Sequence, residues 1–502
     1  MNGRKWKLDE QKAENIREYL LKMGGEEEKV KNISEKWRVR FSDSTFTFYS
    51  TGTLYSTPSN SRDPAVENVW NYIDSIVGSL FIQPTKEFLI GFDETGKGEL
   101  IGHMHLVGVI IPNILFSELE RIISTADTKK KHNFDYWDTI FRQIANFQNK
   151  GLKFIEEKIP PWDIDRYNIN KIMDVVYQRI LNTFFRDIPI EKCRIVIDDY
   201  GIGDNLKRFL NFLKQIGAEI VVSQKADDKY LEVRISSLIA KRNREMVIKT
   251  INEKEEFKIE NLSIGSGNAG NRQTIEWLEK WYKSGKDWPW FIRRSFSSVR
   301  EIEGKKEEIR KEIPPIDENL LTEDFKQQFN SGKLDIRALS VVCPHCGTAS
   351  RSVQLINKED RFIPKCHSCN NTIENLDFTL RYYCGFIIPD SNIINRGLIS
   401  KALDKKSFFD DFTILIPGIV RFECDTPGGK KEFERLGRFA SIGRIKLEEV
   451  GESKSAEFKK LTSQEKDDLI MNLCIEYNAI LITADNQVKA LAVSRKVFTI
   501  FV

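Results

Sequence analysis

Two adjacent carboxylates at the end of an apolar segment are the strongest chemical feature of the chain. Residues 88–92 are apolar and run directly into Asp93 and Glu94, and a Gly-Lys-Gly turn at 96–98 follows. Carboxylates this close raise each other's pKa in an apolar setting, and a divalent cation would stabilise the pair. Glycines let a phosphate approach the backbone, and the lysine adds positive charge. The pattern predicts a metal site that acts on a phosphodiester, whereas the alternative is an ordinary exposed acidic turn.

Further acidic residues follow two other apolar segments that are expected to be strands. Asp198 follows residues 194–197, and Asp227 follows the segment 219–223 after a short turn. Each has an acidic neighbour that competes for the same role, Asp199 and Asp228. Helical segments are expected at 168–185, 204–216 and 230–253. In an open α/β sheet the carboxyl ends of parallel strands lie together, so these distant carboxylates are expected to converge on one site.

These segments resemble, in the same order, the motifs of type 2 ribonucleases H (the HII/HIII group). The matching stretches are residues 91–102, 164–169, 196–198, 225–230, 236–241, 265–267, 274–281 and 293–296. The resemblance covers about residues 83–310. It implies a ribonuclease H-like α/β fold for this part of the chain.

The resemblance also implies a two-metal nuclease site. Mg²⁺ or Mn²⁺ would be held by four carboxylates: Asp93, Glu94, Asp198 and Asp227. Two such ions roughly 3.5–4 Å apart activate a water molecule and stabilise the leaving 3′ oxygen. The implied substrate is RNA paired to DNA, cut to leave 5′-phosphate and 3′-hydroxyl ends. The implied contacts to the RNA backbone and its 2′-hydroxyl come from Gly96, Lys97 and Gly98.

Two positions depart from the family pattern. Lys97 stands where the family has arginine or threonine, so a point charge replaces a planar fork. Asn268 stands where a tyrosine usually follows Gly-Ser-Gly. This departure favours cleavage within a longer RNA stretch over recognition of a single embedded ribonucleotide. Among the basic residues, Lys241 and Arg244 follow the last motif and are expected to contact phosphate, whereas the lysine run 129–131 is expected to be a solvated face.

The N-terminal part, residues 1–82, resembles the small TATA-binding-protein-like substrate domain of the HIII branch. Its matching stretches are 37–40 and 47–55, and a helix is expected over 5–24. The implied function is contact between an aromatic and basic sheet face and a nucleic-acid backbone. The alternative is that Phe46 and Phe48 belong to the core of a small α+β module.

Two Cys-x-x-Cys pairs lie nineteen residues apart and predict a zinc ribbon over residues 339–385. The expected Zn²⁺ ligands are Cys343, Cys346, Cys366 and Cys369. Four thiolates close the coordination sphere, so the metal is expected to be structural. The ribbon either touches nucleic acid or only braces its neighbours. A charged linker is expected before it, over 313–338.

The C-terminal segment, residues 386–502, resembles PIN-domain ribonucleases. Its matching stretches are 388–392, 416–423, 467–470 and 474–485. The resemblance implies an α/β fold with a second Mg²⁺ or Mn²⁺ site formed by Asp390, Glu423, Asp467 and Asp485. Asn392 and Thr483 would hold these carboxylates in place. The implied substrate is single-stranded RNA, and the alternative is a PIN fold used only for binding or packing.

Bulk composition agrees with a globular chain of several domains. The 502 residues carry 77 basic and 74 acidic side chains, so any nucleic-acid surface must be local. No apolar run approaches the roughly 20 residues that span a bilayer, which predicts a cytoplasmic protein without a membrane partner. The leading prediction is an endoribonuclease acting on RNA/DNA hybrids over residues 83–312. The alternatives are a PIN-driven single-strand nuclease on a duplex-binding platform and a non-catalytic nucleic-acid-binding scaffold.

Overall fold

The computed structural model describes most of the chain in two compact units. The described residues are 4–57, 63–78, 81–123, 132, 134–305, 311–312, 316–358, 361–405, 408–452 and 455–502. The lysine run 129–131 and the start of the expected linker, 313–315, lie outside them. One unit comprises residues 1–85, 114–127 and 228–231, and the other comprises 86–113, 128–227 and 232–502.

The first unit contains a five-stranded antiparallel sheet with the strand order β1-β5-β4-β3-β2. Its elements are β1 (Arg4–Lys7), α1 (Glu10–Lys22), β2 (Glu26–Glu27), β3 (Glu35–Phe41), β4 (Ser44–Tyr49), β5 (Thr53–Ser56), α2 (Pro64–Gly78) and α3 (Phe116–Ile123). Side chains of α1, α2 and the strands share one core. Phe46 and Phe48 are buried in it, so they belong to the core and do not present an aromatic face.

The prediction of a helix over 5–24 is wrong about where the helix begins. Residues 5–7 belong to β1 and pair with β5. The helix begins only at Glu10, because the Asp9 side chain caps it by accepting the backbone N–H of Lys12 at 2.8 Å. The helical spacing of apolar residues does continue to the end of α1, where Leu20 is buried.

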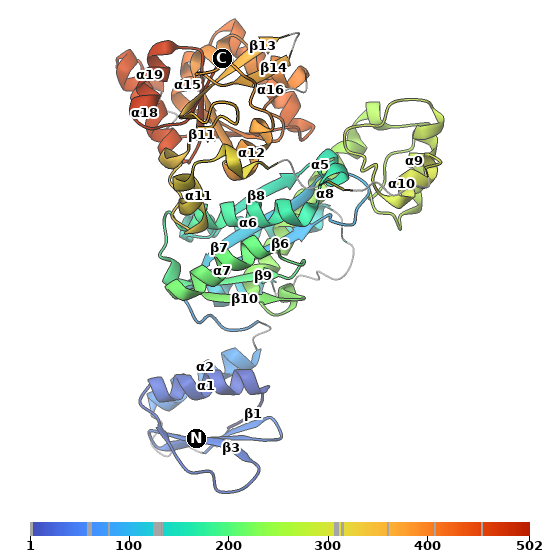
Figure 1. The fold of residues 1–502 in the computed structure, drawn as a ribbon. Coiled ribbons are helices and arrows are strands. Elements are labelled where there is room, and N and C mark those ends of the chain that lie inside the picture. The colour runs from blue at the N-terminus through green and yellow to red at the C-terminus, as the bar shows by residue number, and fades with distance from the viewer. Residues whose placement is uncertain are drawn as a thin grey trace. The chain divides into compact units, whose positions relative to one another are not determined.

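The second unit begins with a five-stranded sheet of order β10-β9-β6-β7-β8 (Figure 1). Its strands are β6 (Phe88–Thr95), β7 (Met104–Pro112), β8 (Lys153–Ile159), β9 (Cys193–Asp198) and β10 (Glu219–Ser223). The strands β6, β9 and β10 run parallel, whereas β7 and β8 are antiparallel to their neighbours. The carboxyl ends of the three parallel strands therefore share one edge of the sheet.

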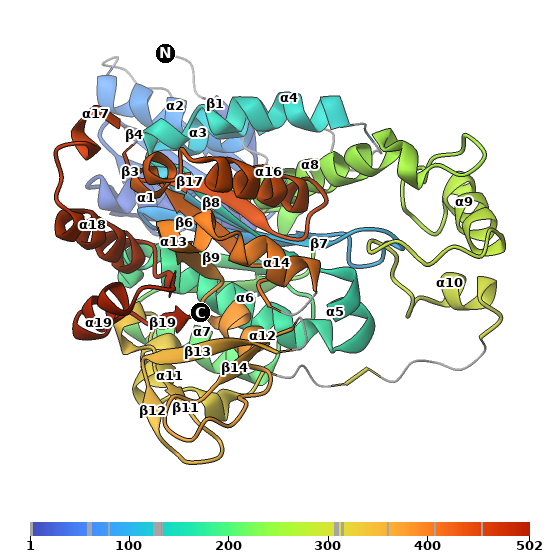
Figure 2. The same ribbon diagram turned by 90° about the horizontal axis from the view of Figure 1, so that it is seen from above.

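Helices on this sheet bury its faces. They are α4 (Phe134–Ala145), α5 (Pro161–Arg166), α6 (Ile169–Phe184), α7 (Asp204–Ile216) and α8 (Leu231–Glu253). Apolar side chains of α6 and α7 pack with those of β6, β7 and β9 in one core, which Figure 1 shows as two helices across the sheet. A separate lobe formed around α9 (Arg272–Lys283) and α10 (Ser297–Ile302) has its own core, and both views show it beside the sheet (Figure 2).

The rest of the unit is built on a seven-stranded sheet of order β14-β13-β19-β18-β15-β16-β17. Its elements are β13 (Ser352–Lys358), β14 (Arg361–Lys365), α12 (Leu376–Tyr383), β15 (Phe386–Pro389), α13 (Ser391–Asn395), α14 (Leu398–Asp404), β16 (Thr413–Pro417), α15 (Gly418–Glu423), α16 (Pro427–Ser441), β17 (Lys446–Val450), α17 (Ser455–Phe458), α18 (Ser463–Glu476), β18 (Ile480–Thr483), α19 (Asn486–Ser494) and β19 (Thr499–Phe501). The hairpin β13–β14 of the cysteine module extends this sheet, because β13 pairs with β19.

The charged stretch expected as a linker over 313–338 is a packed element in its described part. It contains α11 (Glu323–Asn330), and Phe325 and Phe329 on that helix are buried. The amides of Gln178 and Asn182 on α6 donate to the backbone oxygen of Phe329 at 3.2 and 2.8 Å. The sequence suggests a linker because most residues of this short helix are charged or polar and lie on its outer face. Only two aromatic residues form its inner face.

No helix of the described residues is both long and apolar enough to cross a membrane.

Candidate active site

The strand register places Asp93 beside Asp198. In the parallel pair β6–β9, Phe92 lies opposite Ile197, so the next residue on each strand is one of the two aspartates. Asp93 is 8% exposed, because β6 is a central strand covered on both faces. Asp198 accepts the backbone N–H of Ala226 at 3.0 Å, which brings the segment carrying Asp227 to the same edge of the sheet.

The electrostatics of this edge favour a bound cation. Burial and the neighbouring Glu94 raise the pKa of Asp93 to about 8. Burial also raises the pKa of Glu94, with Asp198 acting in the same direction and Lys97 opposing it. Lys241 on α8 opposes the shift at Asp93. Burial therefore disfavours the ionised form of both carboxyl groups, and a bound divalent cation would favour it.

The predicted ligand Asp227 and the competing residue Asp199 differ in their exposure and in their contacts. Asp227 is half-buried, and its backbone oxygen accepts the Nε of Arg234 at 2.7 Å. Asp199, the competing neighbour of Asp198, is exposed and accepts the N–H of Gly201 at 2.9 Å.

A buried arginine holds the glycine turn on its inner side; it begins the matching stretch 293–296 but is not among the predicted site residues. Arg293 is fully buried, and its Nε donates to the Gly102 backbone oxygen at 2.9 Å. Its Nη1 contacts the backbone oxygen of Gly96. One side chain thus fixes both ends of the 96–102 turn. Gly96 requires glycine here because its φ is +94°.

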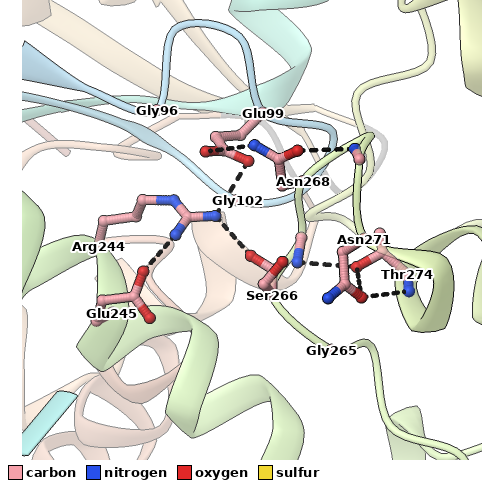
Figure 3. Close-up of polar contacts among 12 residues, drawn as sticks. Gly96, Glu99, Gly102, Arg244, Glu245, Gly265, Ser266, Asn268, Asn271 and Thr274 are labelled. Atoms are coloured by element: carbon pink, nitrogen blue, oxygen red, sulfur yellow. Dashed lines mark hydrogen bonds and ion pairs between the residues drawn. The ribbon is translucent and has the colours of Figure 1, made fainter. Parts of the chain in front are cut away.

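A second contact network ties the turn to the loop that contains Asn268 (Figure 3). The Asn268 amide donates to Glu99 at 3.2 Å, and the same carboxylate lies 3.3 Å from Arg244. Arg244 is buried, and it also donates to the Ser266 backbone oxygen at 2.6 Å. The guanidinium of Arg244 is engaged by the protein and supports the loop in this structure, and its contact to a phosphate stays a prediction.

Two tyrosines lie beneath the carboxylates and were not singled out in the sequence. Tyr177 on α6 is fully buried, and burial together with Glu94 raises its pKa well above the usual value. Its ring contacts the edge of Tyr200, with centroids 5.4 Å apart. Tyr200 follows the Asp198-Asp199 pair directly, so its position next to a strand-end carboxylate was the available signal.

The part of the chain that holds these residues is similar to known ribonucleases. A family model for ribonuclease HII matches residues 90–299. Ribonuclease HII from Methanothermobacter thermautotrophicus is 30% identical over 219 residues, which are 42% of this chain and 97% of the relative. The chain belongs to the ribonuclease HII family. The enzyme from Aeropyrum pernix is 27% identical over 217 residues, covering 43% of this chain and 90% of its own. A ribonuclease H2 crystal structure from Pyrococcus horikoshii matches with 26% identity and a TM-score of 0.35, over 43% of this chain and 97% of that one.

The four predicted zinc ligands lie together beyond the ribonuclease HII region. In the described part of the chain they are the one group of three or more such side chains whose donor atoms all lie within 4.8 Å of one another. Two sulfur–sulfur distances are 3.6 Å for Cys343–Cys369 and 3.8 Å for Cys346–Cys366. A tetrahedral Zn²⁺ with bonds of about 2.3 Å separates its sulfurs by about 3.8 Å. Hydrogen bonds between Cys346 and Thr348 lower the pKa of the Cys346 thiol to about 6, so this ligand ionises readily.

In the C-terminal segment, three of the four predicted acidic ligands contribute to the raised pKa of the fourth. Burial raises the pKa of Asp467 to about 6, and the next contributions come from Asp485, Glu423 and Asp390. Asp390 is buried, and the Thr483 hydroxyl donates to it. The predicted Asn392 side chain is exposed, whereas its backbone N–H acts on Asp390.

Residues at the rim of this second cluster partly neutralise it. Lys466 lies 3.1 Å from Glu423. Asp468, the acidic neighbour of Asp467, pairs instead with Arg495 at 2.6 Å. The lysine was also missed in the sequence, although it directly precedes a predicted ligand.

Both sets of carboxylates are of the kind that binds hard divalent cations, although among the described residues neither set brings three donor oxygens within 4.8 Å of one another. Carboxylate oxygens are the ligands that Mg²⁺ and Mn²⁺ prefer, and each cluster includes a buried aspartate whose pKa burial raises. Such a cation would stabilise the ionised carboxylates, which burial disfavours. The cysteine cluster, with four soft thiolates, suits Zn²⁺ instead.

Proposed function

We propose that the chain is a metal-dependent endoribonuclease that cleaves the RNA strand of RNA/DNA hybrids. The observation that carries the proposal is the pairing of Asp93 and Asp198 at the ends of adjacent parallel strands, next to a glycine turn. Membership of the ribonuclease HII family supports the reaction class. The proposed metal ligands are Asp93, Glu94, Asp198 and Asp227, and the products carry 5′-phosphate and 3′-hydroxyl ends.

Each part of the site has a distinct task in this proposal. Bound Mg²⁺ or Mn²⁺ supplies an activated water and charge stabilisation at the scissile phosphate. The backbone of the 96–98 turn approaches the RNA strand closely because Gly98 is exposed and nothing lies within 4 Å of where its Cβ would be. Lys97 contributes the positive charge of this turn. Arg293 and Arg244 keep the turn in shape from its buried side.

Cleavage of end-labelled RNA annealed to DNA, in the presence of Mn²⁺, tests this proposal. The Asp93→Asn and Asp198→Asn variants are expected to lose more than about 100-fold in rate, since even partners of metal ligands contribute about 10–100-fold. The matched control is Asp199→Asn, which removes the exposed neighbouring carboxylate and is expected to retain activity. Unchanged cutting by Asp93→Asn would assign the activity to the C-terminal acids.

A second candidate function is cleavage of single-stranded RNA by the PIN-like segment. The supporting observation is that Asp390, Glu423 and Asp485 all raise the pKa of Asp467. In this alternative the ribonuclease HII region serves as a duplex-binding platform. Single-stranded RNA cleavage that is lost in Asp485→Asn and kept in Asp93→Asn would support it. Binding without cleavage of either substrate would favour a non-catalytic scaffold.

We also propose that Cys343, Cys346, Cys366 and Cys369 hold one structural Zn²⁺. The two sulfur–sulfur distances near 3.8 Å support this assignment. With four thiolates no coordination position is left for a substrate. The metal would then stabilise the hairpin β13–β14, which extends the C-terminal sheet.

A further inference from the structure

The ammonium group of Lys97 lies against Tyr200, which is 103 residues away in the chain. Its Nζ is 5.3 Å from the centre of the tyrosine ring and 3.5 Å from the Tyr200 backbone oxygen. A cation at this distance from a ring face is attracted by the ring quadrupole. Within the described residues Lys97 has no ion pair, although its charge acts on Glu94.

Tyr200 itself is fixed by several contacts. Its hydroxyl donates to Asp174 on α6 at 2.8 Å, and its ring meets Tyr177 edge-on. Asp174 is buried and also accepts the backbone N–H of Gly203 at 3.1 Å. The Asn170 amide donates to the Tyr200 backbone oxygen at 3.2 Å. The ring is therefore a rigid surface beside the carboxylates.

A rigid surface matters because lysine is flexible. Its side chain is a flexible four-carbon stem that loses rotamer entropy when it is held in one place. Left free, the ammonium of Lys97 would pair with the nearby carboxylates and compete with a metal ion. The Tyr200 ring offers it a place next to the carboxylates that leaves their oxygens available.

We propose that Tyr200 is a positioning residue, which holds the Lys97 ammonium beside the carboxylates where it meets a backbone phosphate of the bound nucleic acid. This inference rests on the proposed function of the Asp93 site. It explains how Lys97 can act in this turn. A lysine ammonium is a point charge on a flexible side chain, whereas the planar guanidinium of an arginine would need less support to keep its orientation.

A double-mutant cycle on hybrid binding tests the inference. The affinity of the full chain for a fluorescent RNA/DNA hybrid is measured by anisotropy without Mg²⁺ or Mn²⁺, for Tyr200→Leu, Lys97→Met and the double variant. Tyr200→Leu is expected to weaken binding about 3- to 10-fold, the range of a partly buried cation–π contact. The same substitution is expected to have no effect when Lys97→Met is already present.

Two further variants separate positioning from folding. Tyr200→Phe keeps the ring over Lys97 and is expected to retain most of the affinity. Tyr282→Leu removes a surface tyrosine that is 44% exposed and is expected to bind like the unaltered protein. Thermal melting of all variants reports whether the fold is intact.

Several outcomes would overturn the inference. Equal weakening by Tyr200→Leu with and without Lys97→Met would mean that Tyr200 acts through the fold. Unchanged binding by Tyr200→Leu would mean that the ring does not position the lysine. Absence of hybrid binding by the unaltered chain would also contradict it. If the unaltered protein binds hybrid but does not cut it with Mn²⁺, the proposed function fails, and the cycle still decides the role of Tyr200.

Discussion

Asp163 and Arg381 form a buried ion pair that joins the ribonuclease HII region to the segment after it. The Arg381 Nη2 lies 2.7 Å from Asp163 on α5, and its Nη1 lies 2.9 Å from Asp411. The Tyr382 hydroxyl also donates to Asp163. Burial raises the pKa of both aspartates, with Arg381 opposing the shift. One guanidinium therefore balances two buried carboxylates from different parts of the chain.

Replacing this arginine is expected to destabilise the protein strongly. Arg381→Met leaves Asp163 and Asp411 buried without their cation, which costs about 3–5 kcal/mol. Thermal unfolding of the full chain measures the effect. The control is Arg438→Met, since Arg438 and its partner Glu434 are 75% and 64% exposed and such pairs contribute at most about 0.5 kcal/mol. Equal effects of the two substitutions would show that the interface does not depend on the buried pair.

Two glycines of the candidate site are expected to respond oppositely to alanine. At Gly91 a Cβ would lie 2.3 Å from the backbone carbon of Glu232, so α8 would have to move away from β6. Gly91→Ala is therefore expected to lower stability by about 3 kcal/mol. At Gly98 nothing lies within 4 Å, so Gly98→Ala is expected to keep the melting temperature. If Gly98 approaches the substrate, its variant raises KM for hybrid, and unchanged kinetics would exclude that contact.

The stability of the protein without added divalent cation is expected to fall as pH rises. An unfolded aspartate loses its proton near pH 4, whereas Asp93 in the folded protein keeps it up to about pH 8. Between these values the folded state binds the extra proton, so stability decreases by up to about 1.4 kcal/mol per pH unit from this group. Melting temperatures at pH 5, 6.5 and 8 test the slope.

Two comparisons assign this slope to the candidate site. The Asp93→Asn variant has no proton to lose and is expected to show a flatter profile, whereas Asp199→Asn keeps the full slope. Added Mn²⁺ binds the ionised carboxylates and is expected to stabilise most at high pH. An unchanged slope in Asp93→Asn would mean that other groups determine the pH dependence.

Zinc content gives a test of the cysteine cluster. One zinc per chain is expected by metal analysis, and Cys366→Ser is expected to lose it and to melt at a lower temperature, because binding energy of a structural zinc is folding energy. Cys474→Ala is the control, since this buried cysteine lies in the apolar core of the C-terminal sheet. Retention of zinc by Cys366→Ser would contradict the assignment.

The sequence by itself determined the order of the chemical motifs along the chain. Asp93, Asp198 and Asp227 each follow an apolar strand, and the alternation of strands and helices predicts a sheet whose carboxyl ends meet. The four cysteines were predictable from spacing alone, because a pair of knuckles brings its own ligands together. The strand-end acids and the cysteine pairs depend on residues that are close together in the chain, so periodicity and motif spacing predict them directly.

Tertiary structure decided which side chains support the site. Arg293, Tyr177 and Tyr200 reach it through long-range packing. Arg293 lies in a matching stretch and Tyr200 follows a strand-end carboxylate, but neither pattern shows what the side chain contacts. The same holds for Arg244, whose position on α8 suggests a phosphate contact but whose guanidinium is paired with Glu99. Burial and pairing depend on which distant segments meet, so only the folded chain sets them.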